Sequence, residues 1–361
     1  MTRAAILYSC PGGLTVEDIE VDTPGPREVL IQTVAAGLCH SDLHFMEGKY
    51  TIGCPAVLGH ESAGVVTAVG SEVSYVRPGD HVITCVSAFC GECEDCLSGN
   101  PARCQNPATH GRPAGARARL RLGDVPLTQF AGLGSYSSDL LVHERALVKI
   151  DENMPLDRAA LIGCGVTTGL GAVFNTAQVP PGATVAVFGC GGIGLNVVQG
   201  ARLSGASRII AVDRVDAKLK LARQLGATDT VNAAQADPVA EIIGLTDGGV
   251  HYSFEAIGLK VAAEQAFGVL RRGGTATVIG MIPVGQVLEI PGAALLAEKK
   301  LQGSIMGSNR FRTDMPFFIE LYRQGRLKLD ELLAEHIGLD DINDGYARMK
   351  KGEIARSVIM F

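Results

Sequence analysis

The sequence lacks the long apolar runs and the clustered positive charge that mark membrane and nucleic-acid-binding proteins. No uninterrupted apolar run reaches the roughly 18 residues that a membrane-spanning helix needs. The formal net charge is −6, and lysine and arginine form no stripe that would bind nucleic acid or an anionic membrane. The opening residues MTRAAILYSCPGG are too weakly apolar for a secretory signal. We therefore expect a soluble, cytoplasmic protein without nucleic-acid or membrane partners.

Tryptophan is absent, aromatic residues make up 5% of the chain, and charged residues make up 19%. No internal repeat with a period of about 20–50 residues is found. Glycine, in contrast, is abundant with 45 residues, which indicates many turns and close backbone approaches. A chain of 361 residues that is 47% hydrophobic is long enough for about two domains with cores of their own.

Four of the ten cysteines lie within the stretch 90-CGECEDCLSGNPARC-104. In a reducing compartment, clustered cysteines indicate metal or redox chemistry rather than a disulfide framework. The pattern C-x2-C-x2-C-x7-C, formed by Cys90, Cys93, Cys96 and Cys104, fits a closed tetrahedral zinc site. Such a site has no open position for a substrate, so we interpret it as structural. An iron–sulfur cluster and a disulfide pair are the alternatives.

The sequence pattern changes along the chain, at about residues 150–165. Residues 1 to about 150 read as short strands and turns, bounded by Gly, Pro and Asp. Between about 165 and 308, β-rich runs at 184–189, 208–213 and 275–280 alternate with helical segments such as 216–227. That alternation indicates βαβ units and a parallel sheet, and hence an α/β protein. An amphipathic segment at 315–325 and an apolar run at 357–361 close the chain.

The segment 184-TVAVFGCGGIGLNVVQGARLSGA-206 carries the pattern G-x-G-x-x-G between a strand and a helix. This context is the one that a dinucleotide-binding fingerprint requires. The residues expected to bind the cofactor are Gly189, Gly191, Gly192, Ile193 and Gly194. Asp213 ends the next strand, and its carboxylate would bind ribose hydroxyls and repel a 2′-phosphate, which favours NAD. Arg214 weakens this preference, because an arginine there can serve the 2′-phosphate of NADP.

Three further potential metal ligands, Cys39, His60 and Cys164, are far apart in the sequence and flanked by glycine. Each has a plain alternative, because buried cysteines behave as small hydrophobic residues and an isolated histidine is often a core residue. The residues alone do not decide whether these three side chains form a metal site.

The segment 59-GHESAGVVTAVGSEV-73 resembles the motif G-H-E-x2-G-x5-G-x2-V of the zinc-dependent medium-chain dehydrogenase/reductase superfamily. The four-cysteine spacing, 162-IGCGVTTG-169, the glycine fingerprint and 352-GEIARSVIMF-361 also match it, in the same order. The resemblance is greatest to liver-type zinc-containing alcohol dehydrogenases. It implies a discontinuous GroES-like β-rich catalytic domain of residues 1–165 and 309–361, and a Rossmann domain of residues 166–308.

The resemblance implies an NAD(P)-dependent alcohol dehydrogenase that transfers hydride reversibly between a primary alcohol and NAD, with two zinc ions per chain and a homodimeric assembly. Cys39, His60 and Cys164 would bind the catalytic zinc, Ser41 and His44 would relay a proton, and Asp42 and Glu61 would support the site. The remaining residues implied to contact the cofactor are His40, Thr168, Asp213, Arg214, Lys218 and Arg356.

By the same resemblance, the substrate pocket would include Tyr50, Val86 and Phe130. Val86 stands where many relatives carry a large aromatic, so we expect benzylic or medium-chain alcohols as substrates. The arginine-rich stretch 112-RPAGARARLRLGD-124 leaves an alternative. It could recognise a carboxylate, as in thiol-dependent formaldehyde dehydrogenases that oxidise an S-hydroxymethyl thiol. A zinc-free reductase and a non-catalytic nucleotide-binding protein are rivals that leave the ligand sets unexplained.

Overall fold

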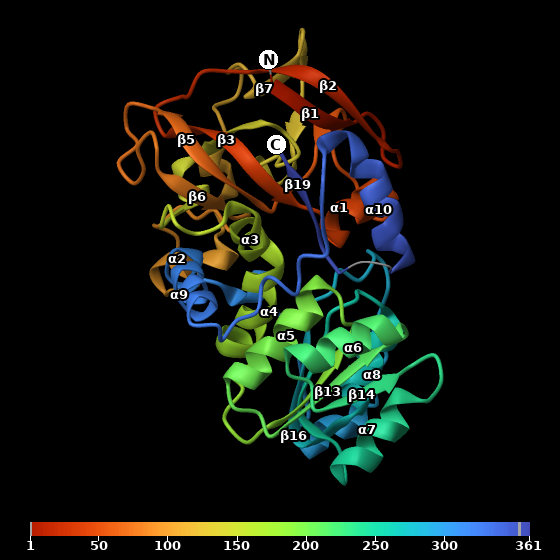
Figure 1. Ribbon diagram of the computed structural model, residues 1–361. Helices are drawn as coiled ribbons and strands as arrows, with labels where there is room; N and C mark the ends of the chain where they lie inside the picture. The colour runs from red at the N-terminus through yellow and green to blue at the C-terminus, as the bar shows by residue number, and fades with distance from the viewer. Residues whose placement is uncertain (1, 353–354) are drawn as a thin grey trace. The chain divides into compact units, whose positions relative to one another are not determined.

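A computed structural model describes residues 2–352 and 355–361, so the motif at 352–361 is described except for positions 353 and 354. The chain divides into two compact units (Figure 1). The first unit comprises Met1–Cys164, Arg310–Gln324 and Leu332–Phe361, and the second comprises Gly165–Asn309 and Gly325–Glu331.

The first unit is built from two β-sheets. One has the strand order β8-β7-β2-β1-β4-β9, and the other has the order β11-β6-β5-β3-β19-β18 with β10 paired to β3. The strands are β1 (Thr2–Leu7), β2 (Leu14–Val21), β3 (Glu28–Gly37), β4 (Ala56–Val57), β5 (Ser62–Val69), β6 (His81–Thr84), β7 (Leu120–Leu122), β8 (Val125–Pro126), β9 (Thr128–Gln129), β10 (Asp139–His143), β11 (Leu147–Ile150), β18 (Glu335–Ile337) and β19 (Ser357–Met360).

Strand β19 pairs antiparallel with β3, with Ile359 opposite Ala36, so segments far apart in the sequence build one sheet (Figure 1). Leu38, Leu58 and Tyr136 are fully buried in a core that also takes side chains from the helix α10. The helices of this unit are α1 (His40–Met46), α2 (Glu94–Leu97), α3 (Leu156–Leu161), α9 (Phe311–Arg323) and α10 (Ile342–Lys351).

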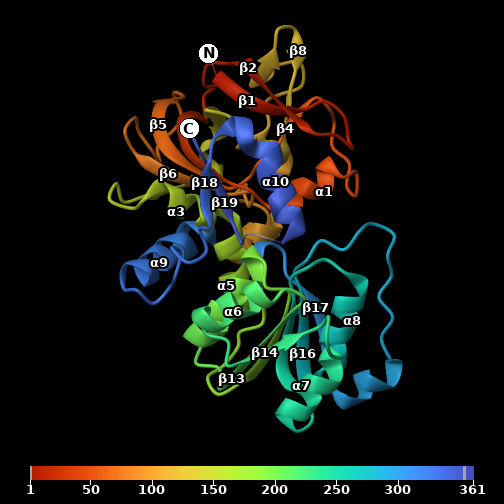
Figure 2. The ribbon, with the colours of Figure 1, turned by 45° about the vertical axis from the view of Figure 1, so that its right-hand side comes forward.

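The second unit is a parallel sheet with the strand order β14-β13-β12-β15-β16-β17. Its strands and helices are β12 (Thr184–Phe188), β13 (Arg208–Asp213), β14 (Asp229–Asn232), β15 (Val250–Glu255), β16 (Leu270–Val278), β17 (Lys300–Gly303), α4 (Thr167–Gly171), α5 (Gly192–Leu203), α6 (Asp216–Leu225), α7 (Pro238–Thr246) and α8 (Lys260–Gly268). Right-handed crossovers place α5 and α6 on one face and α7 and α8 on the other, as Figure 2 shows. The expected α/β class, with a GroES-like part and a doubly wound part, is confirmed.

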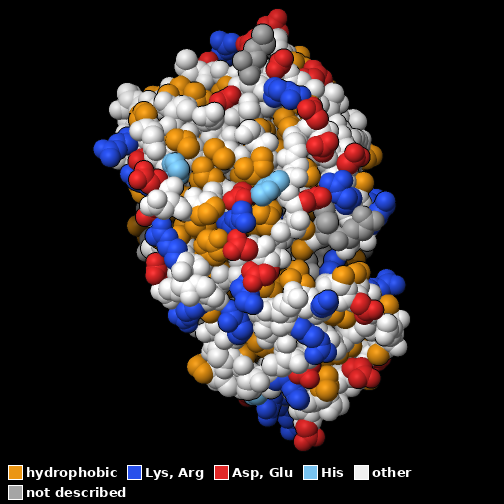
Figure 3. Space-filling view, viewed as in Figure 1, with side chains coloured by type: hydrophobic (Ala, Val, Ile, Leu, Met, Phe, Trp, Pro, Cys, Tyr) orange, Lys and Arg blue, Asp and Glu red, His pale blue; other side chains and the backbone are white. Residues whose placement is uncertain are grey.

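Short 3₁₀ turns connect these elements. They are η1 (Pro101–Arg103), η2 (Pro107–His110), η3 (Phe130–Gly132), η4 (Glu144–Ala146), η7 (Gly292–Ala297), η8 (Met306–Ser308) and η9 (Leu339–Asp341). In the space-filling view of Figure 3, acidic and basic side chains are interspersed over the visible face.

A long helical stretch, Leu156–Thr176, joins α3 to α4 through the π-helical turns η5 (Ile162–Val166) and η6 (Ala172–Thr176). By length and composition alone it could cross a membrane, but 83% of its apolar window is buried, as in the core helix of a globular protein. Asp157 and Arg158 precede its apolar residues, and the polar Thr167, Thr168 and Asn175 interrupt them, which is why the sequence shows no uninterrupted run.

Residues 325–331 group with the second unit, whereas the sequence analysis placed them in the catalytic domain. The Gln199 side chain explains this grouping, because it accepts from the Lys328 amide at 2.8 Å and donates to the Lys328 carbonyl at 3.1 Å. The Lys328 ammonium also donates to the Gln224 carbonyl at 3.0 Å. Elsewhere the domain boundaries implied by the family resemblance differ from this grouping by one residue at most, and they stay a proposal.

Candidate metal centres and nucleotide site

Cys39, His60, Glu61 and Cys164 form a buried group in the first unit, and their ligand atoms all lie within 4.8 Å of one another. Cys39 follows β3 and precedes α1, His60 and Glu61 precede β5, and Cys164 lies in the π-helical turn η5. Gly163 allows this turn to approach β6, because a Cβ at position 163 would lie 2.9 Å from the Thr84 carbonyl oxygen. Three separate elements therefore bring together the ligands that the family resemblance implied.

The protonation of this group fits a cation. A hydrogen bond from Cys164, together with the nearby positive charges of His60 and Arg356, holds the pKa of Cys39 well below its ordinary value despite burial. The same hydrogen bond and burial hold the pKa of Cys164 well above its ordinary value. These directions favour a thiolate at Cys39 beside a thiol at Cys164, and a divalent metal ion can replace the thiol proton. Two cysteines and one histidine are the protein ligands of the catalytic zinc ion in alcohol dehydrogenase.

Asp42 is fully buried and holds the imidazole of His60. The His60 Nδ1 atom lies 3.1 Å from Asp42 Oδ2, and the Gly59 amide donates to Asp42 Oδ1 at 2.9 Å. Burial lowers the pKa of His60, but the charges of Asp42 and Cys39 outweigh this effect and raise it well above the ordinary value. Because Nδ1 faces the carboxylate, Nε2 is the nitrogen that could face a metal ion.

Glu61 contacts the Arg356 guanidinium through Oε2, while its Oε1 atom is buried without a hydrogen-bond partner. Burial raises the pKa of Glu61 to about 7, although the charge of Arg356 opposes this effect. An unpartnered buried carboxylate oxygen beside two thiols is a further sign that a cation fits here. Arg356 was expected to bind the cofactor pyrophosphate, and this role stays a prediction.

Ser41 and His44 lie one turn apart on α1, so their side chains face the same side of the helix. Ser41 Oγ lies 3.7 Å from Cys39 Sγ. Burial, followed by the charge of Lys49, lowers the pKa of His44, and its Nδ1 atom is buried without a hydrogen-bond partner. A neutral histidine can accept a proton, but the relay itself stays a prediction.

An uncharged aromatic wall stands beside the metal group. The Phe130 ring lies 5.4 Å from the His60 ring and 4.8 Å from the Phe45 ring, and the Tyr50 ring lies 6.1 Å from the His44 ring. Phe45 was not expected, because an apolar residue on a helix carries no signal of its own. Val86 packs instead against the core cluster that contains Val29 and Val82, so its pocket role stays a prediction.

The four sulfurs of Cys90, Cys93, Cys96 and Cys104 lie within 4.8 Å of one another. The Cys93 amide donates to Cys90 Sγ and the Cys90 amide donates to Cys104 Sγ, each at 3.2 Å. Backbone donors, the Glu92 amide first, lower the pKa of Cys90 to about 6. Amide donors that stabilise thiolates suit a zinc site with four cysteines. All ten cysteines are free thiols, so the structure gives the disulfide alternative no support.

The glycine fingerprint forms the turn between β12 and α5 in the second unit. A Cβ at Gly194 would lie 1.7 Å from the Gly189 carbonyl oxygen, so the turn requires glycine there. A Cβ at Gly191 would meet nothing within 4 Å, so this side of the turn is open for a ligand. The amides of Gly192, Ile193 and Gly194 open the helix and are suited to a phosphate group. These residues fit a dinucleotide.

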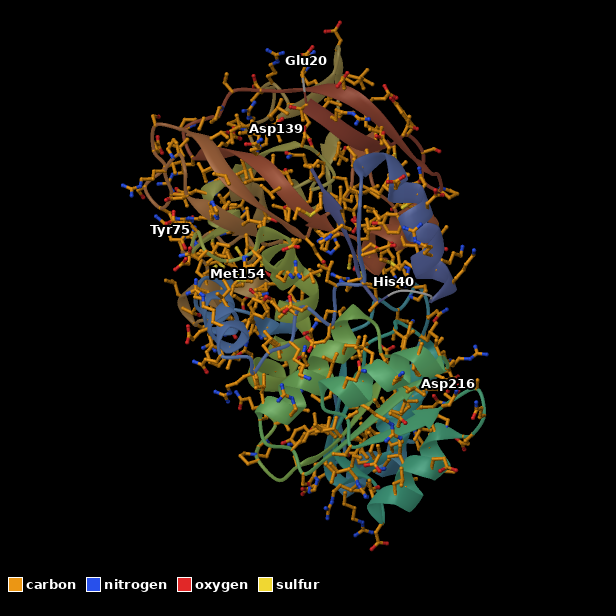
Figure 4. All side chains as sticks on the ribbon, viewed as in Figure 1. Glu20, His40, Tyr75, Asp139, Met154 and Asp216 are labelled. Atoms are coloured by element: carbon orange, nitrogen blue, oxygen red, sulfur yellow. The ribbon has the colours of Figure 1, made fainter. Side chains whose placement is uncertain are left out.

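Other expected cofactor residues lie on several elements. Asp213 ends β13 and accepts from the Cys190 and Arg214 amides at 2.8 Å, and Arg214 is exposed. Lys218 lies in the first turn of α6, and Thr168 donates to the Met306 sulfur at 3.5 Å. His40 opens α1 in the first unit and is exposed (Figure 4). The roles of these residues toward a cofactor stay predictions.

Glu255 is a buried residue that the sequence analysis missed. Its Oε1 atom accepts from the Ile257 and Gly258 amides at 2.8 and 2.7 Å and so shapes the loop after β15. The Ile257 side chain from this loop covers Gly189. An acidic residue at the end of a buried strand was the signal that could have found this support.

The arginine-rich stretch 112–124 does not present free guanidinium groups. Arg112 and Arg119 both donate to the buried Glu28, at 2.6 and 2.7 Å, and Arg112 also pairs with Asp22. The more exposed arginines also have acidic partners, namely Glu20 for Arg117 and Asp124 for Arg121. These ion pairs hold the loop to the first unit and weigh against the alternative that it recognises a carboxylate, which stays a prediction.

Two family models match the chain, "Alcohol dehydrogenase GroES-like domain" at residues 25–152 and "Zinc-binding dehydrogenase" at residues 192–320. The chain is 38% identical over its whole length to an S-(hydroxymethyl)glutathione dehydrogenase of Paracoccus denitrificans, all of which is covered. It is 37% identical to an alcohol dehydrogenase class-3 of Zea mays, covering 99% of this chain and 96% of the relative.

Among solved structures, the benzyl alcohol dehydrogenase of Acinetobacter calcoaceticus matches with a TM-score of 0.94 and 33% identity. The match covers 100% of this chain and 99% of that one. This chain also has two cysteine-containing groups that could hold a metal ion and a glycine-rich turn between a strand and a helix. The family match is therefore consistent with both its fold and its candidate sites. The chain belongs to the zinc-dependent medium-chain dehydrogenase/reductase superfamily, as an oxidoreductase of its zinc-containing alcohol dehydrogenase family.

Proposed function

We propose that this protein oxidises a primary alcohol to the aldehyde at a zinc ion held by Cys39, His60 and Cys164, with NAD as the hydride acceptor. The observation that carries the proposal is the buried group of two cysteines, a histidine and a glutamate within 4.8 Å, beside an uncharged aromatic wall. When bound, zinc supplies Lewis-acid chemistry toward the alcohol oxygen, and NAD accepts the hydride. The reaction yields aldehyde, NADH and one proton.

The chain's own residues hold the reactants and move that proton. Asp42 fixes the ring of His60 so that Nε2 is left for the metal. Ser41 lies beside Cys39, and His44, with its lowered pKa, is neutral near pH 7 and can receive the proton that the alcohol loses. The open turn at Gly191 and the amides that follow it bind the pyrophosphate of the cofactor.

The side chains of Phe45, Tyr50 and Phe130 form an uncharged wall. This wall favours an apolar, benzylic or medium-chain substrate, because an aromatic or aliphatic group can pack against the rings. The similarity to a benzyl alcohol dehydrogenase supports this choice. A series of alcohols followed by NADH absorbance tests it. We expect a higher kcat/KM for benzyl alcohol than for ethanol, and a loss of about 3–10-fold for benzyl alcohol in Phe130→Leu. Activity that peaks at ethanol and collapses for benzyl alcohol would refute the proposal.

A second candidate function is the oxidation of an S-hydroxymethyl thiol formed from formaldehyde. The relatives named S-(hydroxymethyl)glutathione dehydrogenase support it at 38% identity. The ion pairs of Arg112 and Arg119 weigh against a carboxylate site in this loop. Formaldehyde oxidation measured with and without added glutathione separates the two functions, because only the second requires the thiol.

We propose NAD rather than NADP, because the Asp213 carboxylate lies at the end of β13, where a 2′-phosphate would meet its negative charge. The exposed Arg214 is the competing feature. Kinetics with both cofactors decide between them: Asp213→Ala is expected to narrow the preference for NAD. A wild-type preference for NADP would contradict this assignment.

We also propose a homodimer in the cytoplasm, where the ten thiols would stay reduced. The strand β17 forms an edge of the sheet in the second unit and can pair with another copy. Several large apolar side chains of this unit are exposed near it in sequence, namely Val284, Val287, Leu295, Leu296 and Ile305. Light scattering tests the assembly, and a monomer at micromolar concentration would refute it.

A further inference from the structure

Behind His60, a row of buried polar side chains leads away from the metal group. The Tyr136 hydroxyl lies 3.0 Å from Asp42 Oδ2 and 2.5 Å from the Tyr346 hydroxyl. Tyr136 precedes β10 and is fully buried, and Tyr346 lies on α10 with 3% of its surface exposed. The two tyrosines are separated by 210 positions in the sequence, and neither was among the expected site residues.

The direction of these hydrogen bonds follows from counting protons, because each hydroxyl has one hydrogen to donate. Tyr136 has two further acceptors in reach, Asp42 Oδ2 at 3.0 Å and the Gly37 carbonyl at 3.4 Å. The carboxylate is both nearer and charged, so Tyr136 donates to Asp42. Tyr346 then donates its hydrogen to the Tyr136 oxygen.

Asp42 therefore has three donors around it: the Gly59 amide, the His60 Nδ1–H group and the Tyr136 hydroxyl. The two oxygens of a carboxylate have enough acceptor sites for all three. This arrangement holds the Nδ1–H group of His60 toward Asp42 and leaves Nε2 as the nitrogen that can face a metal ion. The tyrosine pair thus affects which ring nitrogen of His60 can face a metal ion.

We propose that Tyr136 and Tyr346 are positioning residues of the metal site. Their hydroxyl groups fix the Asp42 carboxylate and, through it, the orientation and tautomer of His60. This inference rests on the proposed zinc site at Cys39, His60 and Cys164. Partners of this kind around metal ligands typically change metal affinity by about 10–100-fold when they are removed.

A purely structural role is the alternative, because both tyrosines also belong to a core cluster with Leu38 and Ile342. The two roles separate in a pair of variants. In Tyr136→Phe, Asp42 loses a donor and the buried Tyr346 hydroxyl loses its acceptor, so both metal affinity and stability fall. In Tyr136→Phe/Tyr346→Phe, no hydroxyl is left unpaired, so stability recovers, but Asp42 still lacks its third donor.

The experiment measures zinc affinity and thermal unfolding on the full-length, zinc-loaded protein. Competition with a chelator gives the Kd of each zinc ion, and the four-cysteine site of the same chain serves as the internal reference. We expect Tyr136→Phe and the double variant to weaken the Cys39–His60–Cys164 site about 10-fold, with the reference site unchanged. Tyr8→Phe is the matched control, because its exposed hydroxyl bonds only to Glu17 among the described contacts, and we expect no change in either site.

Recovery of the Tm in the double variant without recovery of zinc affinity supports the inference. Zinc affinity that is unchanged in both variants, or that rises and falls with the Tm, overturns it while the proposed function stands. If Tyr136→Phe does not fold, the same comparison is made between the wild type and the double variant. A wild-type protein that binds one zinc ion, at the four-cysteine site alone, overturns the proposed function and this inference together.

Discussion

Glu28 is the residue through which the arginine-rich loop is held to the first unit, and its removal tests that interpretation. It accepts from Arg112, Arg119 and the Gly25 amide, at 2.6, 2.7 and 2.8 Å. Burial raises the pKa of Glu28, but the two guanidinium groups outweigh it and lower the value from 4.5 to about 2. That difference corresponds to about 3 kcal/mol of unfolding free energy above pH 4.5.

Glu28→Gln should therefore lower the unfolding free energy at pH 7 by about 3 kcal/mol, because the charged acceptor that Arg112 and Arg119 share is lost. The matched control is Glu20→Gln, whose partner Arg117 is largely exposed, and we expect a change of about 0.5 kcal/mol or less. Urea unfolding followed by circular dichroism measures both.

The dependence on pH has a definite sign. Because the pKa of Glu28 is lowered in the folded state, its contribution is complete above about pH 4.5 and disappears as the pH falls toward 2. The difference between the wild type and Glu28→Gln should shrink over this range. A difference below about 1 kcal/mol at pH 7, or one that does not depend on pH, would refute the account of the loop as a brace.

Three further predictions concern the two metal centres and the nucleotide site. Cys39→Ser should abolish turnover and leave one zinc ion per chain, with NADH binding intact. Cys96→Ser should mainly lower the Tm. Metal analysis measures the zinc content, and calorimetry measures the Tm. His44→Gln should slow turnover by about 100-fold, with partial rescue by added imidazole, because a neutral proton acceptor is lost; unchanged pH–rate profiles would exclude the relay. Gly194→Ala should weaken NADH binding at least about 10-fold, measured by fluorescence titration, since its Cβ would meet the Gly189 carbonyl at 1.7 Å; unaltered affinity would contradict this role.

Features that are local in sequence were predictable from it. The turn after β12 is specified by a strand, three spaced glycines and a helix, and the structure has the strand at Thr184–Phe188 and the helix from Gly192. The four-cysteine group lies within fifteen residues, so its spacing alone indicated a metal site. The expected helix at 216–227 ends at Leu225 in the structure, because Gly226 has a positive φ of 126°.

Features that depend on distant partners were not predictable in the same way. Cys39, His60 and Cys164 come from three elements, and the resemblance to a family, rather than their spacing, indicated that they meet. The acidic partners of Arg112 lie 84 and 90 positions away, so the loop read as a row of free charges. The Tyr136–Tyr346 contact carried no sequence signal, since two tyrosines 210 positions apart are individually ordinary core residues.

The pairing of β19 with β3 has a consequence for the order in which the nascent chain folds. Residues of β3 leave the ribosome early, but their partner strand, Ser357–Met360, is synthesised after the whole of the second unit. The second unit, which is contiguous apart from 325–331, can form first, while the first unit waits with an unpaired sheet edge. Arg356 and Tyr346 are also synthesised after the second unit, so the surroundings of His60 are completed only after that unit has been synthesised. Ribosome-stalled chains that end before β18 should therefore bind the nucleotide but hold zinc poorly at the Cys39–His60–Cys164 site.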